Sequence, residues 1–320
     1  MPATSRPQRA AASGTTPPSL RRSRPRYAER VVEALLMIAA FVSIATTIGI
    51  VIALIPPTVD FFGKPEISVW DFLTGTDWSP LFAAGQRQFG VIPLVSATLV
   101  ITAIACLVAI PLGLGAATYL SEYASRRVRD VLKPVLEVLA GVPTVVYGFF
   151  ALEFVTPFLG RVLPFEIDIY NALSAGLVMG IMIIPTVASL AEDAMTAVPN
   201  SLRDGAYALG STRRQVSVRV VIPAALSGIV AAFILGISRA IGETMIVAIA
   251  AGGRPNLSLN PLEEMQTMTG FIAAAGLGDQ PTGSVGYETI FAVGTLLFLI
   301  TLVMNLISIQ LVRKYREVYE

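Results

Sequence analysis

The chain has 320 residues, of which 54% are hydrophobic and only 14% charged, and its formal net charge at pH 7 is +1. About a quarter of the residues in soluble domains are charged, so this composition argues against an ordinary soluble protein. No histidine occurs, and the one cysteine, Cys106, lies in an apolar run. Histidine metal sites, the usual catalytic triads and a disulfide framework are therefore excluded.

The first 88 residues divide into a tail, a span and a loop. Residues 1–26 are rich in Arg, Ser, Pro and Ala without apolar periodicity, which predicts a disordered basic tail. Residues 27–88 are expected to hold the first transmembrane helix and an extracytoplasmic loop. The apolar run at 31–55 is too long for the core of a signal peptide, and Pro56 and Pro57 are expected to end it.

The rest of the chain predicts an all-α bundle. Apolar runs that reach the roughly 20 residues needed to cross a bilayer recur through residues 89–312. Glycine and proline inside them predict bent spans with cavities between them. Residues 313–320 form a short tail. Together with the first run this gives six transmembrane helices, the later five at 89–120, 134–158, 171–190, 220–250 and 287–312.

The positions of the basic residues predict the orientation. Six spans place both termini on one side of the membrane. Residues 1–30, the loop after the second span, the loop at 193–219 and the tail at 313–320 together hold 18 of the 23 Lys and Arg. Because loops rich in Lys and Arg stay inside, both termini and the 193–219 loop are expected in the cytoplasm of a bacterial cell, with the protein in its inner membrane.

One polar, basic stretch separates two apolar runs and reads RDGAYALGSTRRQVSVRVVIPAAL, residues 203–226. Its spacing resembles the EAA loop of ABC importer permeases, which reads Glu-Ala-Ala, three residues, Gly, nine residues, Ile, one residue, Leu-Pro. The resemblance implies a short coupling helix that docks on a separate ATPase subunit. The alternative is an ordinary basic loop. The residues that carry the resemblance, with Arg203 as a charged neighbour, are Asp204, Gly205, Ala206, Gly210, Val220, Ile222 and Pro223.

The fifth span contains the charged residues Arg239 and Glu243. By the rise of a helix, Arg239 lies roughly 16 Å below the outer end of that span, where a charge is costly and normally faces a cavity or a partner. Glu243 follows four residues later and is expected on the same helical face. The pair either neutralises itself or forms an anion site, with Ser238 and Thr244 supplying hydroxyls nearby.

Phosphate fits the second alternative chemically. A guanidinium presents a fork of donors that matches phosphate. A carboxylate beside it can accept a hydrogen bond from protonated phosphate, whereas sulfate at neutral pH carries no such proton.

A second resemblance concerns the whole of residues 89–312. The segments FGVIPLVSATL, EVLAGVPTVVYGFFAL, SRAIGET and QTMTGFI are similar to those of phosphate ABC importer permeases of the PstC type. The resemblance implies the type I ABC importer permease fold. It also implies that Arg239 and Glu243 take part in phosphate translocation.

No Gly-x-x-x-x-Gly-Lys-Ser/Thr sequence for binding nucleotide phosphates occurs in the chain. We therefore expect a transport subunit that is not an enzyme and binds no cofactor, with ATP and magnesium bound by a partner. The resemblance implies a second, PstA-like permease, two PstB-like ATPase subunits and a PstS-like extracytoplasmic phosphate-binding protein.

Three other functions stay open on the sequence. The same machine could import another oxyanion, such as sulfate or molybdate. The chain could be an ion-coupled secondary carrier that needs no ATPase, although the predicted coupling loop argues against this. It could also be a membrane scaffold or sensor that transports nothing, against which the bent spans and Arg239 argue.

Overall fold

A computed structural model describes residues 27–315 except residue 84. The predicted tail at 1–26 and residues 316–320 lie outside this range. The described part of the chain is helical, and its one β-type contact is an isolated bridge between Trp78 and Phe89. The expected all-α class is confirmed. Two units divide the chain, one up to Val51 and one from Ile52 onwards.

The first unit consists of the larger part of helix α1 (Tyr27–Phe62), which is apolar on every side. Each of its residues from 29 to 50 is exposed. A helix that is hydrophobic all round and not covered by protein is suited to lipid.

The expectation that Pro56 and Pro57 end the first helix is wrong, because α1 continues through both to Phe62. Thr58 donates its hydroxyl to the carbonyl of Leu54 at 2.7 Å, beside the proline pair. Hydroxyl side chains of this kind help to satisfy the backbone where proline interrupts a membrane helix.

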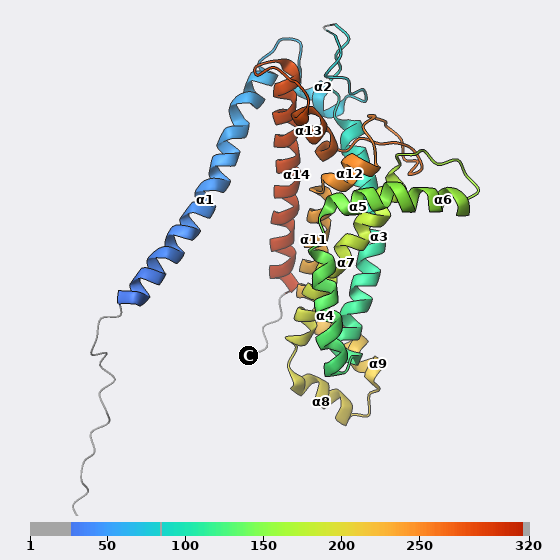
Figure 1. Ribbon diagram of the computed structural model, residues 1–320. Helices are drawn as coiled ribbons and strands as arrows, with labels where there is room; N and C mark the ends of the chain where they lie inside the picture. Colours follow the sequence, from blue (N-terminus) through green and yellow to red (C-terminus); the bar gives the residue numbers. More distant parts are fainter. Residues whose placement is uncertain (1–26, 84, 316–320) are drawn as a thin grey trace, which may run out of the picture. The chain divides into compact units, whose positions relative to one another are not determined.

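The second unit is built around a group of long helices that run side by side (Figure 1). Helix α7 packs against both α3 and α11, and α11 also packs against α14. The α3–α7 contact is close because glycine faces it: a Cβ atom on Gly176 would lie 2.7 Å from the Cβ of Ile104. The bounds of these helices are α3 Ile92–Thr118, α7 Ala172–Thr196, α11 Leu226–Ile241 and α14 Val285–Tyr315.

The predicted third span is not one helix. It is interrupted between Ala140 and Thr144, where Pro143 has no N–H to donate and disfavours helical geometry in the residue before it. Two of the segments around this break are π-helical. In chain order the segments are η1 Tyr119–Tyr123, α4 Arg126–Ala140, α5 Thr144–Phe150, η2 Ala151–Val155 and α6 Thr156–Val162.

The predicted fifth span is broken twice. Its first part meets α11 at a bend of 72° at Ala225, and α11 ends before Gly242. Within the described residues, five helices are long and apolar enough to cross a membrane, or six if the bent pair is one span. The shorter segments of this region are α9 Arg213–Val216, η3 Ser217–Val221, α10 Ile222–Ala224 and α12 Met245–Ala250.

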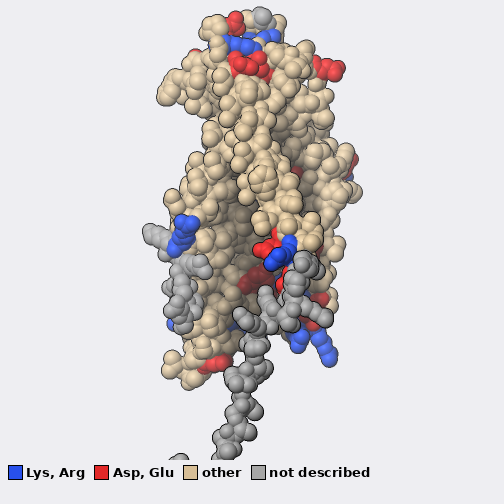
Figure 2. Space-filling view, turned by 90° about the vertical axis from the view of Figure 1, so that its left-hand side faces the viewer, with Lys and Arg blue, Asp and Glu red and all other residues tan. Residues whose placement is uncertain are grey.

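The two ends of the second unit differ. One end carries α2 (Val69–Thr74) and α13 (Met268–Leu277), and the other carries α8 (Asn200–Ala208) (Figure 1). At the α2 end, Trp78 packs edge-to-face on Phe72 and Phe271. Charged side chains gather over this end, and a broad uncharged surface lies below them (Figure 2). An uncharged band between charged ends suits a protein whose middle contacts hydrocarbon.

Candidate functional site

Arg239 lies in the last turn of α11 and points towards α7. It is half-buried, and its Nη1 donates a hydrogen bond to the hydroxyl oxygen of Thr186 at 2.9 Å. Tyr147 of α5 is buried within electrostatic range of Arg239. Its hydroxyl donates a hydrogen bond to the carbonyl of Leu139. Three segments that are far apart in the sequence thus meet around one guanidinium.

Glu243 does not pair with Arg239. The expectation that both lie on one face of a continuous helix is wrong, because α11 ends at Ile241. The Oε1 atom of Glu243 instead accepts backbone N–H bonds from Met245 at 3.1 Å and Ile246 at 3.4 Å, at the start of α12. A carboxylate is stabilised at a helix N-terminus, so it satisfies these free N–H groups rather than the guanidinium.

The other two predicted pathway residues have separate neighbours. The hydroxyl of Ser238 lies 3.4 Å from the side-chain oxygen of Asn305 on α14. The hydroxyl of Thr244 lies 3.4 Å from the carbonyl of Gly242 in the break after α11. The structure therefore brings Arg239 to Thr186 and does not gather the four residues in one cluster.

Sequence reasoning missed Thr186. Its hydroxyl contacts Arg239, and the residue also lines a cavity of about 250 Å³ between α4 and α7. Ser189 lies on the same wall and Glu137 on the wall formed by α4. The sequence feature that could have pointed to this site is the presence of two hydroxyl residues, Thr186 and Ser189, in the apolar run after Pro185.

A short helix, α8, forms in the stretch for which a coupling helix is predicted, but Arg203 points inward from it. Its Nη2 donates to Glu122 Oε1 at 3.1 Å and to the carbonyl of Met195 at 2.8 Å, and its Nη1 donates to the carbonyl of Val198. The Arg203 side chain is only 14% exposed. Arg203 therefore holds α8 against the bundle and does not present its charge to a partner.

The other residues of the coupling pattern divide into two groups. Asp204, Gly205, Gly210 and Pro223 are exposed, and Gly210 adopts a φ of +81° that lets the chain turn after α8. The second group, Ala206, Val220 and Ile222, packs against the cluster around buried Val216.

Leu209, which sequence reasoning did not single out, is 89% exposed beside the exposed group. A leucine so exposed at a loop tip suits contact with another protein.

A charge network ties the same end of the unit together. Lys133 of α4 bonds Glu192 at 2.7 Å and Asp193 at 2.9 Å, and Glu192 is only 2% exposed. These hydrogen bonds to two carboxylates raise the pKa of Lys133 above its ordinary value of 10.5. The network fixes α4 to the end of α7, next to the contact that Arg203 makes with η1.

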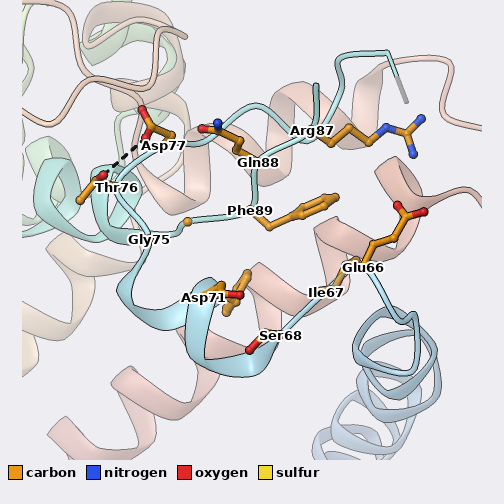
Figure 3. A pocket seen from close by; sticks show the side chains of 12 residues that line it. Glu66, Ile67, Ser68, Asp71, Gly75, Thr76, Asp77, Arg87, Gln88 and Phe89 are labelled. Carbon is orange, nitrogen blue, oxygen red and sulfur yellow. Dashed lines mark hydrogen bonds between the residues drawn. The ribbon is translucent and has the colours of Figure 1, made fainter. Parts of the chain in front are cut away.

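A hollow of about 350 Å³ opens at the opposite end, beside α2 (Figure 3). The side chains of Glu66, Asp77 and Arg87 line it, together with the backbones of Gly75 and Gly90, which lie in close contact. A Cβ on Gly90 would lie 2.2 Å from the carbonyl carbon of Gly75, so neither glycine can carry a side chain without moving the loop.

Comparison with a family model gives a match over residues 109–317, to the binding-protein-dependent transport system inner membrane component. A probable ABC transporter permease protein, YqgH of Bacillus subtilis, is 35% identical over 88% of this chain and 86% of its own length. The phosphate transport system permease protein PstC of Xylella fastidiosa is 32% identical over 77% and 80%. PstC 1 of Mycobacterium tuberculosis is 31% identical over 80% and 85%.

Two solved structures show the same fold at low identity. A chain of a bacterial ABC transporter involved in the import of alginate matches with a TM-score of 0.62 and 15% identity, over 90% of this chain and 97% of that one. A chain of the MetNI methionine ABC transporter in an inward-facing conformation matches with a TM-score of 0.53 and 17% identity, over 71% and 95%.

Proposed function

The chain belongs to the family of binding-protein-dependent transport system inner membrane components, and from this membership we propose that it forms half of the path of an ATP-driven importer of inorganic phosphate. It is a permease subunit with the type I ABC importer fold, and not an enzyme. The observation that carries phosphate as the substrate is the similarity to PstC proteins over three quarters or more of the chain.

The surroundings of Arg239 support the same proposal. Among the described residues, the half-buried guanidinium of Arg239 bonds the neutral hydroxyl of Thr186 and no carboxylate, so its charge is not neutralised by an ion pair and it retains further donors. A tetrahedral oxyanion that passes can therefore receive a forked contact. We include Glu243, Ser238 and Thr244 in the proposed path. Glu243 would accept a hydrogen bond from the hydroxyl of protonated phosphate through Oε2, the oxygen that does not cap α12.

The proposed assembly follows from what this chain lacks and what it exposes. No nucleotide-binding loop occurs in the sequence, so we assign ATP and magnesium to two PstB-like ATPase subunits. The exposed tip of α8, with Asp204, Gly205 and Leu209, is the proposed contact with them. A PstA-like permease and a PstS-like binding protein complete the importer. From the distribution of Lys and Arg we infer that both termini and α8 lie in the cytoplasm.

Uptake by vesicles that hold the whole assembly tests the substrate. We expect ATP-dependent uptake of radiolabelled phosphate that excess sulfate and molybdate do not compete away. Competition by sulfate or molybdate at equal concentration would instead assign another oxyanion. Uptake by the chain alone under an ion gradient would assign a secondary carrier. The matched control is an assembly whose ATPase subunits cannot hydrolyse ATP.

A further inference from the structure

A polar hollow of about 290 Å³ lies at the α8 end of the second unit, separate from the surroundings of Arg239. Five segments form it: η1, α4, α7, α8 and α9. Three of its lining residues are arginines, Arg129, Arg203 and Arg213, whereas Glu122 is its one acidic lining residue. The lining thus carries two more positive than negative formal charges.

The excess charge resides on two of the three arginines. Arg203 is neutralised by Glu122 at 3.1 Å. The nearest carboxylate to Arg129 is Glu192 at 3.8 Å, and Glu192 bonds Lys133 much more closely at 2.7 Å. Among the described residues, the guanidinium of Arg213 has no hydrogen bond or ion pair. Arg129 therefore shares the carboxylate of Glu192 with Lys133, and Arg213 has no carboxylate partner among the described residues.

Both guanidinium groups are held in position without using all their donors. Arg129 donates from Nη2 to the carbonyls of Leu120 and Ser121, at 2.6 and 3.0 Å, which leaves its Nη1 for another acceptor. The guanidinium of Arg213 lies over the ring of Tyr123, 5.1 Å from its centroid. Because these contacts fix the side chains beforehand, a bound anion loses little affinity to their ordering.

We propose that this hollow binds a phosphate group, anchored by Arg129 and Arg213. A doubly charged phosphate or phosphate monoester matches the two excess charges, and a guanidinium matches the spacing of phosphate oxygens. The Tyr207 hydroxyl and the Asn200 amide group line the same hollow and supply neutral donors. The group can come from free phosphate or from the head group of an anionic lipid. This assignment does not depend on which substrate the chain transports.

Occupation of the hollow would connect parts of the chain that are otherwise joined by few polar contacts. Arg129 belongs to α4 and Arg213 to α9, so a shared anion holds the segment after α8 against the bundle. Arg203 already does the same for α8 itself. The bound phosphate is thus a second, reversible connection at this end of the unit.

Arginine modification mapped by mass spectrometry tests the proposal on the full assembly, reconstituted in discs of phosphatidylcholine. Phenylglyoxal reacts with accessible guanidinium groups. Arg214 is the matched internal control, because it is the exposed neighbour of Arg213 and does not line the hollow. We compare the rates at Arg213 and Arg214 with inorganic phosphate, and with potassium chloride of equal ionic strength. A second set of discs contains phosphatidic acid, whose head group is a phosphate monoester.

At a phosphate concentration about ten times the dissociation constant, modification of Arg213 is expected to slow about tenfold while that of Arg214 is unchanged. Selective protection by phosphate in phosphatidylcholine discs identifies free phosphate as the source. Selective protection only in the discs with phosphatidic acid identifies the lipid. If neither protects Arg213, or if Arg214 is protected equally, the proposal is overturned. Because no transport is measured, the result is separate from the test of the substrate.

Discussion

The guanidinium of Arg203 lies 3.1 Å from the carboxylate of Glu122, which is 7% exposed, so a buried ion pair joins α8 to the end of α3 through η1. The two residues are 81 positions apart in the sequence. The same arginine also donates to two carbonyls at the end of α7. A displacement of α8 therefore acts directly on the two helices that form the centre of the bundle.

Substitution of Arg203 by glutamine should destabilise the assembly by about 3 kcal/mol or more, because it leaves the buried carboxylate of Glu122 without a cation. We expect a lower melting temperature and ATP hydrolysis that no longer drives uptake. The double variant with Glu122→Gln should recover part of the stability, since the buried charge is removed as well. Arg214→Gln is the exposed control. Equal melting temperatures for Arg203→Gln and Arg214→Gln would contradict the prediction.

Substitution of Arg239 by glutamine should reduce phosphate uptake about tenfold to a hundredfold with the assembly intact. This is the range expected when one charge-assisted contact worth about 1.5–3 kcal/mol is lost. Thr186→Val removes the hydroxyl and keeps the shape, so it should reduce uptake less. The measurement is ATP-dependent uptake by vesicles with matched amounts of assembly. Undiminished uptake by Arg239→Gln would make Arg239 a structural charge.

Substitution of Glu243 by glutamine separates its two roles. An amide oxygen can still accept the N–H bonds from Met245 and Ile246, so α12 and the assembly should persist. An amide is a weaker acceptor for a phosphate hydroxyl, and we expect uptake to fall about tenfold. Uptake at the rate of the unsubstituted chain would show that Glu243 only caps α12.

Substitution of Gly176 by alanine should destabilise the bundle by about 1–3 kcal/mol, because the added methyl group collides with Ile104. Gly115→Ala on α3 is the matched control, since an added Cβ there meets nothing within 4 Å. Thermal unfolding of the purified chain in detergent measures both variants. A melting temperature for Gly176→Ala that equals that of Gly115→Ala would mean that α3 and α7 are not in close contact.

Lys133 should titrate above pH 10.5, since its bonds to Glu192 and Asp193 favour the charged form. A folded-state pKa above the unfolded value means that this stabilisation is fully present below pH 10.5 and is lost as the pH rises through the folded-state value. Carbon-13 methylation and NMR suit a chain with three lysines, and Lys133→Arg assigns the signal. A midpoint at or below 10.5 would contradict the prediction.

The sequence predicted the helical class, the family and the position of α8, because long apolar runs and fixed motif spacing are local signals. It did not predict the breaks at Ala225 and Gly242 or the helix that continues through Pro56. Those features involve individual side-chain hydrogen bonds that hydrophobic periodicity does not reveal, such as the capping of α12 by Glu243 and the bond from the Thr58 hydroxyl to Leu54. The inward direction of Arg203 was also missed, because the partner Glu122 is remote in sequence and nothing local marks the pair.

Helix α11 is bounded by the bend at Ala225 and by the break that follows Ile241, and it has 16 residues. It is therefore a rod about 24 Å long, with a bend at its start and a break at its end. Arg239 lies near the end that is remote from α9. Because of that length, a rotation of α11 by about 5° about Ala225 would move the Ile241 end of the helix by about 2 Å. A lever of this length converts a small tilt at Ala225 into a displacement near Arg239 that is large enough to break a hydrogen bond of its guanidinium.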